Sequence, residues 1–350
     1  MTKKKKDPVI AKLTNIFTDG DAQDSHIGKR LLNMIRTSQQ IVTPPFPRQI
    51  QVETTNICNH GCQFCAYTLM ERPKRQMDPN LFKHLVKEAY ECGAREIGLF
   101  AGAEPLTCKW IVEYISYCKD LGYDYMYIST NGSIPDQDKF KKVLDAGLNS
   151  IKFSVNGGNR EVYKTVHGND HFDRVIDNIK YVSCYRNQVE QDVYLGVSFV
   201  GMESSKHTFE ELKELIGDYV DEVIYYEASN QSGQMDNLPL PPYRDCHLPF
   251  NKLHISREGY LKACCNDYEN LLAIEDLNVM SIKDAWQSKR FQELRKKHIE
   301  NKLDGTLCGN CIRGSKEKPY AINPQLLHTN TVIEKTQTLK QIPVMIETTN

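Results

Sequence analysis

Residues 54 to 65 read Thr54-Thr55-Asn56-Ile57-Cys58-Asn59-His60-Gly61-Cys62-Gln63-Phe64-Cys65 and contain three cysteines in the order Cys-x-x-x-Cys-x-x-Cys. The β-rich residues 49–54 predict a strand directly before them, so we expect one loop to supply all three thiols. Three thiolates can hold three irons of a four-iron cluster. The fourth iron then has no protein ligand and is free to bind a small molecule through an amine and a carboxylate. The triplet therefore predicts an open, reactive iron site.

Other uses of the cysteines fit less well. Structural zinc takes four ligands from paired motifs, whereas no fourth cysteine lies near the triplet. A disulfide framework requires secretion, but residues 10–15, which follow the basic N-terminus, are broken by charge and do not form the apolar centre of a signal sequence. Twelve cysteines in 350 residues of a cytoplasmic chain favour metal or thiolate chemistry.

Composition excludes two classes of partner. The net charge of −1 gives no electrostatic basis for binding nucleic acid. Two basic stretches, Lys289-Arg290 and Arg295-Lys296-Lys297, lie on a predicted amphipathic helix, and we interpret them as a solvated face. No apolar run approaches the roughly 20 residues that span a bilayer. We expect a cytoplasmic protein that binds neither nucleic acid nor membrane.

The middle of the chain alternates β-rich and helical patterns. Strands are predicted at residues 49–54, 96–100, 125–130, 150–155, 193–200 and 222–226. A segment with apolar residues at i, i+3 and i+4 follows each of the first five, which predicts a parallel sheet with helices outside. Six strands fit a partial (β/α)6 barrel of the TIM type as well as an open doubly wound sheet. In a barrel the functional groups gather at the carboxyl ends of the strands, where the cysteine loop lies.

The triplet after strand one, with the aromatic Phe64 before its third cysteine, resembles the radical S-adenosylmethionine (SAM) superfamily. Residues 101–105 follow strand two and are similar to the Gly-Gly-Glu-Pro segment of that family, whose backbone holds the methionine amino group. The matching residues are Gly102, Ala103, Glu104 and Pro105, and Ala103 replaces a glycine. The resemblance implies a [4Fe-4S] cluster with SAM bound to its open iron.

The resemblance places further SAM contacts after strands three, four and five. Hydroxyl and amide groups stand where the family contacts ribose and the methionine carboxylate; these residues are Ser129, Asn131, Ser154 and Asn156. Arg160 follows strand four and is expected to pair with that carboxylate through a bidentate fork. The adenine motif of strand five is only approximate, and Gly201 alone is taken from it.

A second group of cysteines lies near the C-terminus. Cys246 is followed by a predicted hairpin that turns at Glu258-Gly259 and ends at Cys264, then by an amphipathic helix over residues 282–295, and then by Cys308 and Cys311. On ligand count alone this closed set also suits structural zinc. Its order resembles the twitch form of the SPASM extension, which holds an auxiliary [4Fe-4S] cluster. The fuller SPASM pattern needs further cysteines after Cys311, and the sequence has none.

We therefore expect five segments. They are an N-terminal helical segment (1–47) with short helices at 10–17 and 27–35, a partial barrel (48–228), a linker (229–242), an auxiliary-cluster domain of β-hairpin plus helix (243–315) and a tail (316–350).

By the resemblance, reductive cleavage of SAM gives a 5′-deoxyadenosyl radical that removes hydrogen from the substrate, and an auxiliary cluster can accept the second electron. Such an oxidation needs a general base. Glu227, at the end of strand six, and Glu53, on strand one, are the candidates by position. Cys265 is a further candidate, either as an alternative ligand or as a hydrogen-atom donor, and the other interpretation is a neighbour of Cys264 with no chemical role.

The leading hypothesis is a radical SAM oxidoreductase or epimerase that acts on a sugar, aminocyclitol or related hydroxylated small molecule. Its electrons would come from a donor such as flavodoxin or ferredoxin. A peptide-modifying maturase is the alternative, although short N-terminal helices provide no strand edge that could bind a leader peptide. A zinc-stabilised binding module is a third hypothesis.

Overall fold

A nine-stranded sheet forms the centre of the protein in the computed structural model, which describes residues 25–241 and 245–327. The helix expected at residues 10–17 lies outside the described residues. The strands are β1 (Gln49–Val52), β2 (Glu96–Gly98), β3 (Tyr125–Thr130), β4 (Ser150–Ser154), β5 (Tyr194–Gly201), β6 (Glu222–Glu227), β7 (Lys252–Ile255), β8 (Tyr260–Lys262) and β9 (Ala273–Asp276). Among the described helices, none has the length and apolar character needed to cross a membrane.

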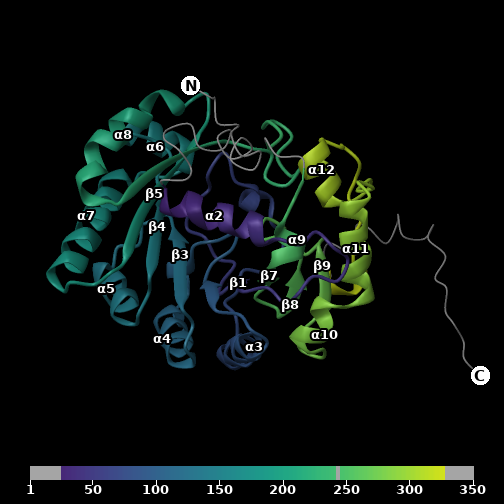
Figure 1. Ribbon diagram of the computed structural model, residues 1–350. Helices are drawn as coiled ribbons and strands as arrows, with labels where there is room; N and C mark the ends of the chain where they lie inside the picture. The colour runs from purple at the N-terminus through teal and green to yellow at the C-terminus, as the bar shows by residue number, and fades with distance from the viewer. Residues whose placement is uncertain (1–24, 242–244, 328–350) are drawn as a thin grey trace, which may run out of the picture.

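Strands β1 to β6 pair in parallel in chain order and curve into a partial barrel with helices on its outside (Figure 1). The outer helices are α3 (Pro79–Glu91), α4 (Ile111–Leu121), α5 (Gln137–Asp145), α6 (Arg160–His167), α7 (Phe172–Gln188) and α8 (Phe209–Ile216). Short 3-10 turns occur at Ala66–Leu69, Pro105–Thr107, Lys206–Thr208, Gly217–Tyr219 and Pro324–Leu326. The predicted partial barrel is thereby confirmed, because each βα unit places its helix over the same apolar outer face.

The two faces of the barrel sheet differ in polarity. Residues such as Ile128 and Phe153 point outward and are fully enclosed by helices. Their neighbours Tyr127, Ser129 and Lys152 point to the other side, which we call the inner face, and are only partly buried. Parallel strands are usually apolar on both faces, so polar residues at alternate positions indicate that the inner face borders a cavity.

Helix α2 (His26–Thr37) lies across the inner face, enclosed by the arc of strands (Figure 1). Leu32 packs against Ile224 of β6, and the Arg30 guanidinium lies 3.7 Å from the ring centre of Tyr125 at the start of β3. Ser25 caps the helix by accepting a hydrogen bond from the Gly28 N–H. α2 thus covers the amino ends of several barrel strands and leaves their carboxyl ends free.

The C-terminal extension continues the barrel sheet. β7 pairs in parallel with β1, and β8 and β9 then add antiparallel strands. Gly259 has φ +87° and makes the predicted turn between β7 and β8. The extension also contains α9 (Leu248–Asn251), α10 (Ile282–Trp286), α11 (Lys289–Ile299) and α12 (Leu307–Arg313). Backbone hydrogen bonds therefore join the two cysteine-bearing parts directly.

One predicted helix is two helices in the structure. The apolar pattern over residues 282–295 is interrupted at Gln287, and Ser288 starts α11 by accepting from the Phe291 N–H. The expectation that Arg295 belongs to a solvated face is wrong, because its side chain is fully buried. Its guanidinium stacks on Phe291 at 3.8 Å and donates to the Trp286 carbonyl at 2.8 Å, so carbonyl oxygens and aromatic rings replace water around it.

The predicted linker packs closely against the auxiliary cysteines. Asn230 Nδ2 donates to the carbonyls of Asn310 and Cys311 at 3.1 and 3.2 Å. Gly233 has φ +76°, and a Cβ there would lie 2.3 Å from the Cβ of Asn310. These contacts make the segment part of the wall around the second cysteine group.

Candidate active site

The cysteine loop lies at the carboxyl end of β1 and is fixed by three neighbouring segments. The Cys58 N–H donates to the Tyr67 hydroxyl at 2.8 Å. The Ile57 carbonyl accepts from the Glu104 N–H at 3.2 Å, and the Gln63 N–H donates to the Val166 carbonyl of α6 at 2.9 Å. The loop is therefore held by the β2 loop and by α6, as the resemblance implies for a cofactor site at the strand ends.

Each thiol of the triplet has its own polar partner from a different part of the chain. The three pairs are Asn131 Nδ2 and Cys58 Sγ at 4.0 Å, His167 Nδ1 and Cys62 Sγ at 3.4 Å, and Tyr268 Oη and Cys65 Sγ at 3.3 Å. N–H and O–H groups directed at sulfur stabilise its negative charge. The donors therefore fit thiolates bound to an iron–sulfur cluster.

The pKa values of the three triplet thiols agree with binding of an iron–sulfur cluster. Burial raises the pKa of Cys58 to about 12, and burial together with the neighbouring thiols raises the pKa of Cys62. Burial also raises the pKa of Cys65, partly offset by the Tyr268 hydroxyl. Such thiols stay protonated unless a metal takes up their charge, so this donor set fits a cluster that binds with loss of protons.

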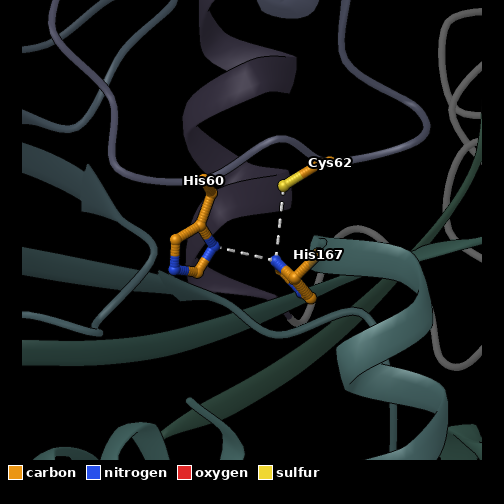
Figure 2. Close-up of side chains that lie close together, drawn as sticks. All are labelled: His60, Cys62 and His167. Atoms are coloured by element: carbon orange, nitrogen blue, oxygen red, sulfur yellow. Dashed lines mark hydrogen bonds between the residues drawn. The ribbon is translucent and has the colours of Figure 1, made fainter. Parts of the chain in front are cut away.

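His167, at the end of α6, directs its Nδ1 toward Cys62 and His60 (Figure 2). The backbone N–H of Asn156 donates to His167 Nε2 at 3.0 Å, which makes Nε2 the acceptor and leaves the proton on Nδ1. Burial holds the pKa of His167 well below its usual value, so the ring is neutral. Its Nδ1–H therefore faces the Cys62 sulfur, with His60 Nδ1 at 3.3 Å as a second neighbour.

His60, Cys62 and His167 also bring three metal-binding atoms within 4.8 Å of one another (Figure 2). This set resembles part of a zinc site. His60 Nε2 lies 2.8 Å from the Ser133 hydroxyl and His167 Nε2 is held by Asn156, so both rings have structural partners on their far sides. Metal analysis distinguishes this use from an iron–sulfur cluster.

We expect His167→Phe to make the triplet's cluster harder to reduce. Phenylalanine keeps the stacking on Tyr163 (4.1 Å between ring centres) but removes the Nδ1–H that faces Cys62. One lost hydrogen bond to a charged sulfur, worth roughly 1 kcal/mol, corresponds to a potential lowered by on the order of 50 mV. Redox titration followed by electron paramagnetic resonance measures the shift at equal iron content. His171→Phe, a nearby imidazole, is the control, and equal potentials in the two variants would contradict the role of His167.

The segment after β2 supports the site through its buried side chains. The Glu104 carboxylate accepts from the Thr130 hydroxyl at 2.7 Å and from the Asn131 N–H at 2.6 Å, and burial raises its pKa to about 7. A Cβ on Gly102 would lie 2.3 Å from the Tyr268 ring, so only glycine fits there. Ala103 packs in the same small apolar cluster as Tyr268. The Glu104 side chain thus ties β2 to β3, which leaves the main chain of this segment for a ligand.

Other predicted SAM contacts are brought to the same region. The hydroxyls of Ser129 and Ser154 lie 3.5 Å apart on adjacent strands. The Phe64 ring stands edge-on to His167 with 6.2 Å between centres, and Pro105 opens a 3-10 turn. The Asn156 side chain is already engaged, because its Oδ1 accepts from the Val200 N–H at 2.6 Å. Asn156 therefore positions His167 and β5 in this structure.

Two expected SAM contacts have other partners. Arg160 is exposed and forms ion pairs with Asp170 at 2.7 Å and Asp173 at 3.1 Å, so its guanidinium is committed on the surface. Gly201 leaves room for the Tyr225 ring, whose hydroxyl would lie 2.0 Å from an added Cβ. The structure gives neither residue the role that the resemblance implied.

The structure does not support Glu53 or Glu227 as the general base. Glu53 is buried in an ion pair with Arg72 (2.7 Å), and although burial opposes ionisation, Arg72 and Lys262 lower its pKa to about 2. Glu227 accepts from the Tyr225 hydroxyl at 3.1 Å. Tyr225 packs against Phe209 of α8, and Glu227 lies on the same side of β6, so it faces the helix layer. Sequence position showed neither the partner of Glu53 nor the face of Glu227.

The second group of cysteines is gathered in one place. Burial is the largest effect that raises the pKa of Cys246 and Cys308, and the adjacent Cys265 thiol is the largest effect that raises the pKa of Cys264. Other thiols of the same group, including Cys311 in each case, raise these three pKa values further. The Asn266 N–H donates to Cys264 Sγ at 3.4 Å. Four half-buried thiols in mutual electrostatic contact fit the predicted auxiliary cluster.

Cys265 makes a fifth thiol at this group. The adjacent Cys264 thiol and the nearby His254 ring lower its pKa well below the usual value, although burial opposes this. His254 is a buried residue of β7, on the same face of the strand as Lys252. Cys265 thus lies near both Cys264 and His254, a position compatible with either of its predicted chemical roles.

Sequence reasoning missed His167, Tyr268 and the lysines of the inner face. His167 and Tyr268 are distant from the triplet in sequence, and no local pattern connects them. The inner-face lysines did leave a signal, because polar and apolar residues alternate through β3 and β4. That alternation is unusual for parallel strands.

Two family models match the chain. The radical SAM superfamily model covers residues 52–216, and an iron–sulfur cluster-binding domain, SPASM, covers residues 246–312. The chain therefore belongs to the radical SAM superfamily and has a C-terminal auxiliary-cluster domain of the SPASM or twitch type. It is an enzyme of this class, with SAM and [4Fe-4S] clusters as cofactors.

Its sequence relatives have different activities. A 2-deoxy-scyllo-inosamine dehydrogenase of Niallia circulans, which depends on SAM, is 23% identical over 274 residues (75% of this chain, 91% of that one). A probable GTP 3′,8-cyclase of Saccharolobus islandicus is 26% identical over 267 residues (65% and 86%). An uncharacterised protein of Methanocaldococcus jannaschii is 32% identical over 145 residues, and the match spans only 46% of it.

Solved structures show the same fold. BtrN in complex with AdoMet and 2-DOIA superposes with a TM-score of 0.53 at 19% identity, covering 76% of this chain and 91% of BtrN. Streptococcus suis SuiB bound to its precursor peptide SuiA gives 0.62 at 13% identity, covering 87% and 81%. These similarities establish the fold.

Proposed function

We propose that this chain is a radical SAM oxidoreductase or epimerase that removes a hydrogen atom from a hydroxylated small molecule such as a sugar or aminocyclitol. We assign Cys58, Cys62 and Cys65 to the cluster that binds SAM. The auxiliary cluster is assigned to Cys246, Cys264, Cys308 and Cys311. When bound, SAM and the reduced cluster supply the radical that removes the hydrogen.

The observation that carries the proposal is the enclosed, polar inner face. A cavity of about 220 Å³ lies under α2, and its wall includes Tyr127, Ser129 and Lys152. Hydroxyl and ammonium groups suit a polar small molecule. α2 packs over the amino ends of the strands, and the described cavity beneath it has the volume of a small molecule rather than of a long peptide. The dehydrogenase relative acts, by its name, on an aminocyclitol, which supports the same substrate class.

The residues of the chain have defined parts in this proposal. The donors Asn131, His167 and Tyr268 tune the charge on the triplet sulfurs, and the joined sheet fixes the auxiliary cysteines relative to the barrel. Cys265 is proposed as the hydrogen donor if the outcome is epimerisation. A reduced flavodoxin or ferredoxin is the proposed electron source.

The test is anaerobic purification with metal analysis, followed by incubation with SAM, a reductant and panels of sugars, aminocyclitols and peptides. We expect about eight irons per chain and release of 5′-deoxyadenosine that rises with a hydroxylated small molecule. In deuterated water, an epimerised product gains deuterium at the inverted carbon, whereas dehydrogenation gives a ketone. Zinc in place of iron, or stimulation by peptides alone, would refute the proposal.

A further inference from the structure

The cavity under α2 has an unbalanced charge. It measures about 220 Å³ and is lined by one side of α2 and by inner-face residues of several strands. Three of the lining residues are cations, Arg30, Lys152 and Lys252, whereas no aspartate or glutamate among the described residues lines it. The described part of this cavity is therefore positively charged.

Two of these cations have partners within the protein. Arg30 Nη2 pairs with Glu96 Oε2 at 2.6 Å, just outside the cavity lining, and its guanidinium stacks on Tyr125. Lys252 Nζ donates to the Tyr127 hydroxyl at 3.1 Å. A tyrosine hydroxyl is neutral, so this partner provides no negative charge to balance the Lys252 ammonium.

Lys152 has no hydrogen bond or ion pair with any described residue; its Nζ lies 5.7 Å from the centre of the Tyr226 ring. Glu222 is the acidic group that faces it, but this carboxylate already accepts from the Tyr194 hydroxyl. Burial, and then the charge of Lys252, lower the pKa of Lys152 to about 8. Burial of the Lys152 ammonium beside another cation costs folding free energy. A ligand of opposite charge would recover this free energy on binding.

We propose that this cavity binds a carboxylate or phosphate group of the substrate, with Lys152 and Lys252 as its two ammonium partners. Lysine provides compact charges that suit such oxygen anions. This inference rests on the proposed small-molecule function and adds to it an anionic group on the substrate. Arg30 positions the wall through Tyr125 and Glu96.

SAM also has a carboxylate, so its position matters. Lys152 precedes Ser154 by two residues on the same face of β4, about 7 Å along the strand. Lys252 pairs in register with Gln49, at the amino end of β1, whereas the cysteine loop follows the carboxyl end. The ammonium groups are thus deeper in the barrel than the residues around the triplet, which favours the substrate as the source of the anion.

Inorganic phosphate is the probe for the test, titrated calorimetrically into the anaerobic holoenzyme with and without saturating SAM. The variants are Lys152→Met and Lys152→Arg, and the matched control is Lys180→Met on α7, where Nζ lies 5.2 Å from the Tyr219 ring. We expect Lys152→Met to weaken phosphate binding at least about tenfold. Lys152→Arg and Lys180→Met should stay within about threefold, and SAM affinity should be unchanged in all variants.

Three results would overturn the inference. They are no phosphate binding by the wild type, equal binding by Lys152→Met at equal iron content, and competition between phosphate and SAM together with weaker SAM binding in Lys152→Met. The last would assign the cations to the SAM carboxylate. Because phosphate binding is measured without turnover, failure of the proposed function, seen as no release of 5′-deoxyadenosine with small molecules, is recorded separately.

Discussion

Replacing Cys58, Cys62 and Cys65 together by alanine is expected to remove about four irons per chain and to reduce SAM cleavage to background. The three thiols come from one loop, and their partners Asn131 and Tyr268 cannot replace a thiolate. The auxiliary cysteines belong to the C-terminal extension and should keep their iron. Iron and sulfide counts with assay of 5′-deoxyadenosine measure both effects.

The converse variant separates the two sites. Cys308→Ala with Cys311→Ala should also lose about four irons, but SAM cleavage should persist while product formation falls. Cys92→Ala with Cys184→Ala changes the C-cap thiol of α3 and an exposed thiol of α7, which belong to neither group, and should keep full iron content. If the triple variant kept all of its iron, the assignment of the triplet would be wrong.

Arg72→Met is expected to destabilise the protein by about 3 to 5 kcal/mol, because it leaves the buried Glu53 carboxylate without its ion-pair partner and leaves Glu258 with Arg257 alone. Arg72 is almost fully buried and pairs with Glu53 of the barrel segment at 2.7 Å and with Glu258 of the hairpin at 2.8 Å. Arg48→Met is the control, since Arg48 is exposed beside Glu96 and should cost under about 1 kcal/mol. Urea unfolding at pH 7 measures both changes, and equal midpoints would contradict the prediction.

The same ion pair predicts a pH dependence. Because Arg72 and Lys262 overcome the effect of burial and lower the pKa of Glu53 to about 2, below its usual 4.5, the pair stabilises the fold above pH 4.5. That contribution is lost as the pH falls from 4.5 toward 2. The difference in unfolding free energy between wild type and Glu53→Gln should therefore shrink over this range. A constant difference would show that Glu53 is not ionised in the folded protein.

The βα repeat was predictable because its signals are local. Apolar periodicity defined the six barrel strands within a few residues, and Glu258-Gly259 defined the hairpin. The break between α10 and α11 at Gln287 was not predicted, because the helical spacing of apolar residues continues across it. Ser288, a typical N-cap residue, was the available signal. Glu53 was misassigned because its partner, Arg72, lies in a loop with no regular pattern.

The parts of the site that come from one continuous loop were predictable. The triplet and the residues after β2 are contiguous, so their chemistry is visible in the sequence. His167 and Tyr268 reach the sulfurs only through tertiary packing, from about one hundred and two hundred residues away. The pairing of β7 with β1 is equally nonlocal, and no rule of strand pattern selects that edge.

That pairing has a consequence for synthesis of the chain. Until Lys252–Ile255 leave the ribosome, β1 can pair with β2 on one side, but its other edge is not yet paired with β7. An open edge of this kind favours pairing with other chains, and closure across some two hundred residues is slow. A nascent chain that stops before β7 therefore exposes the strand that leads into the cysteine loop. Completion of the sheet protects that strand and brings the second group of thiols into place in the same step.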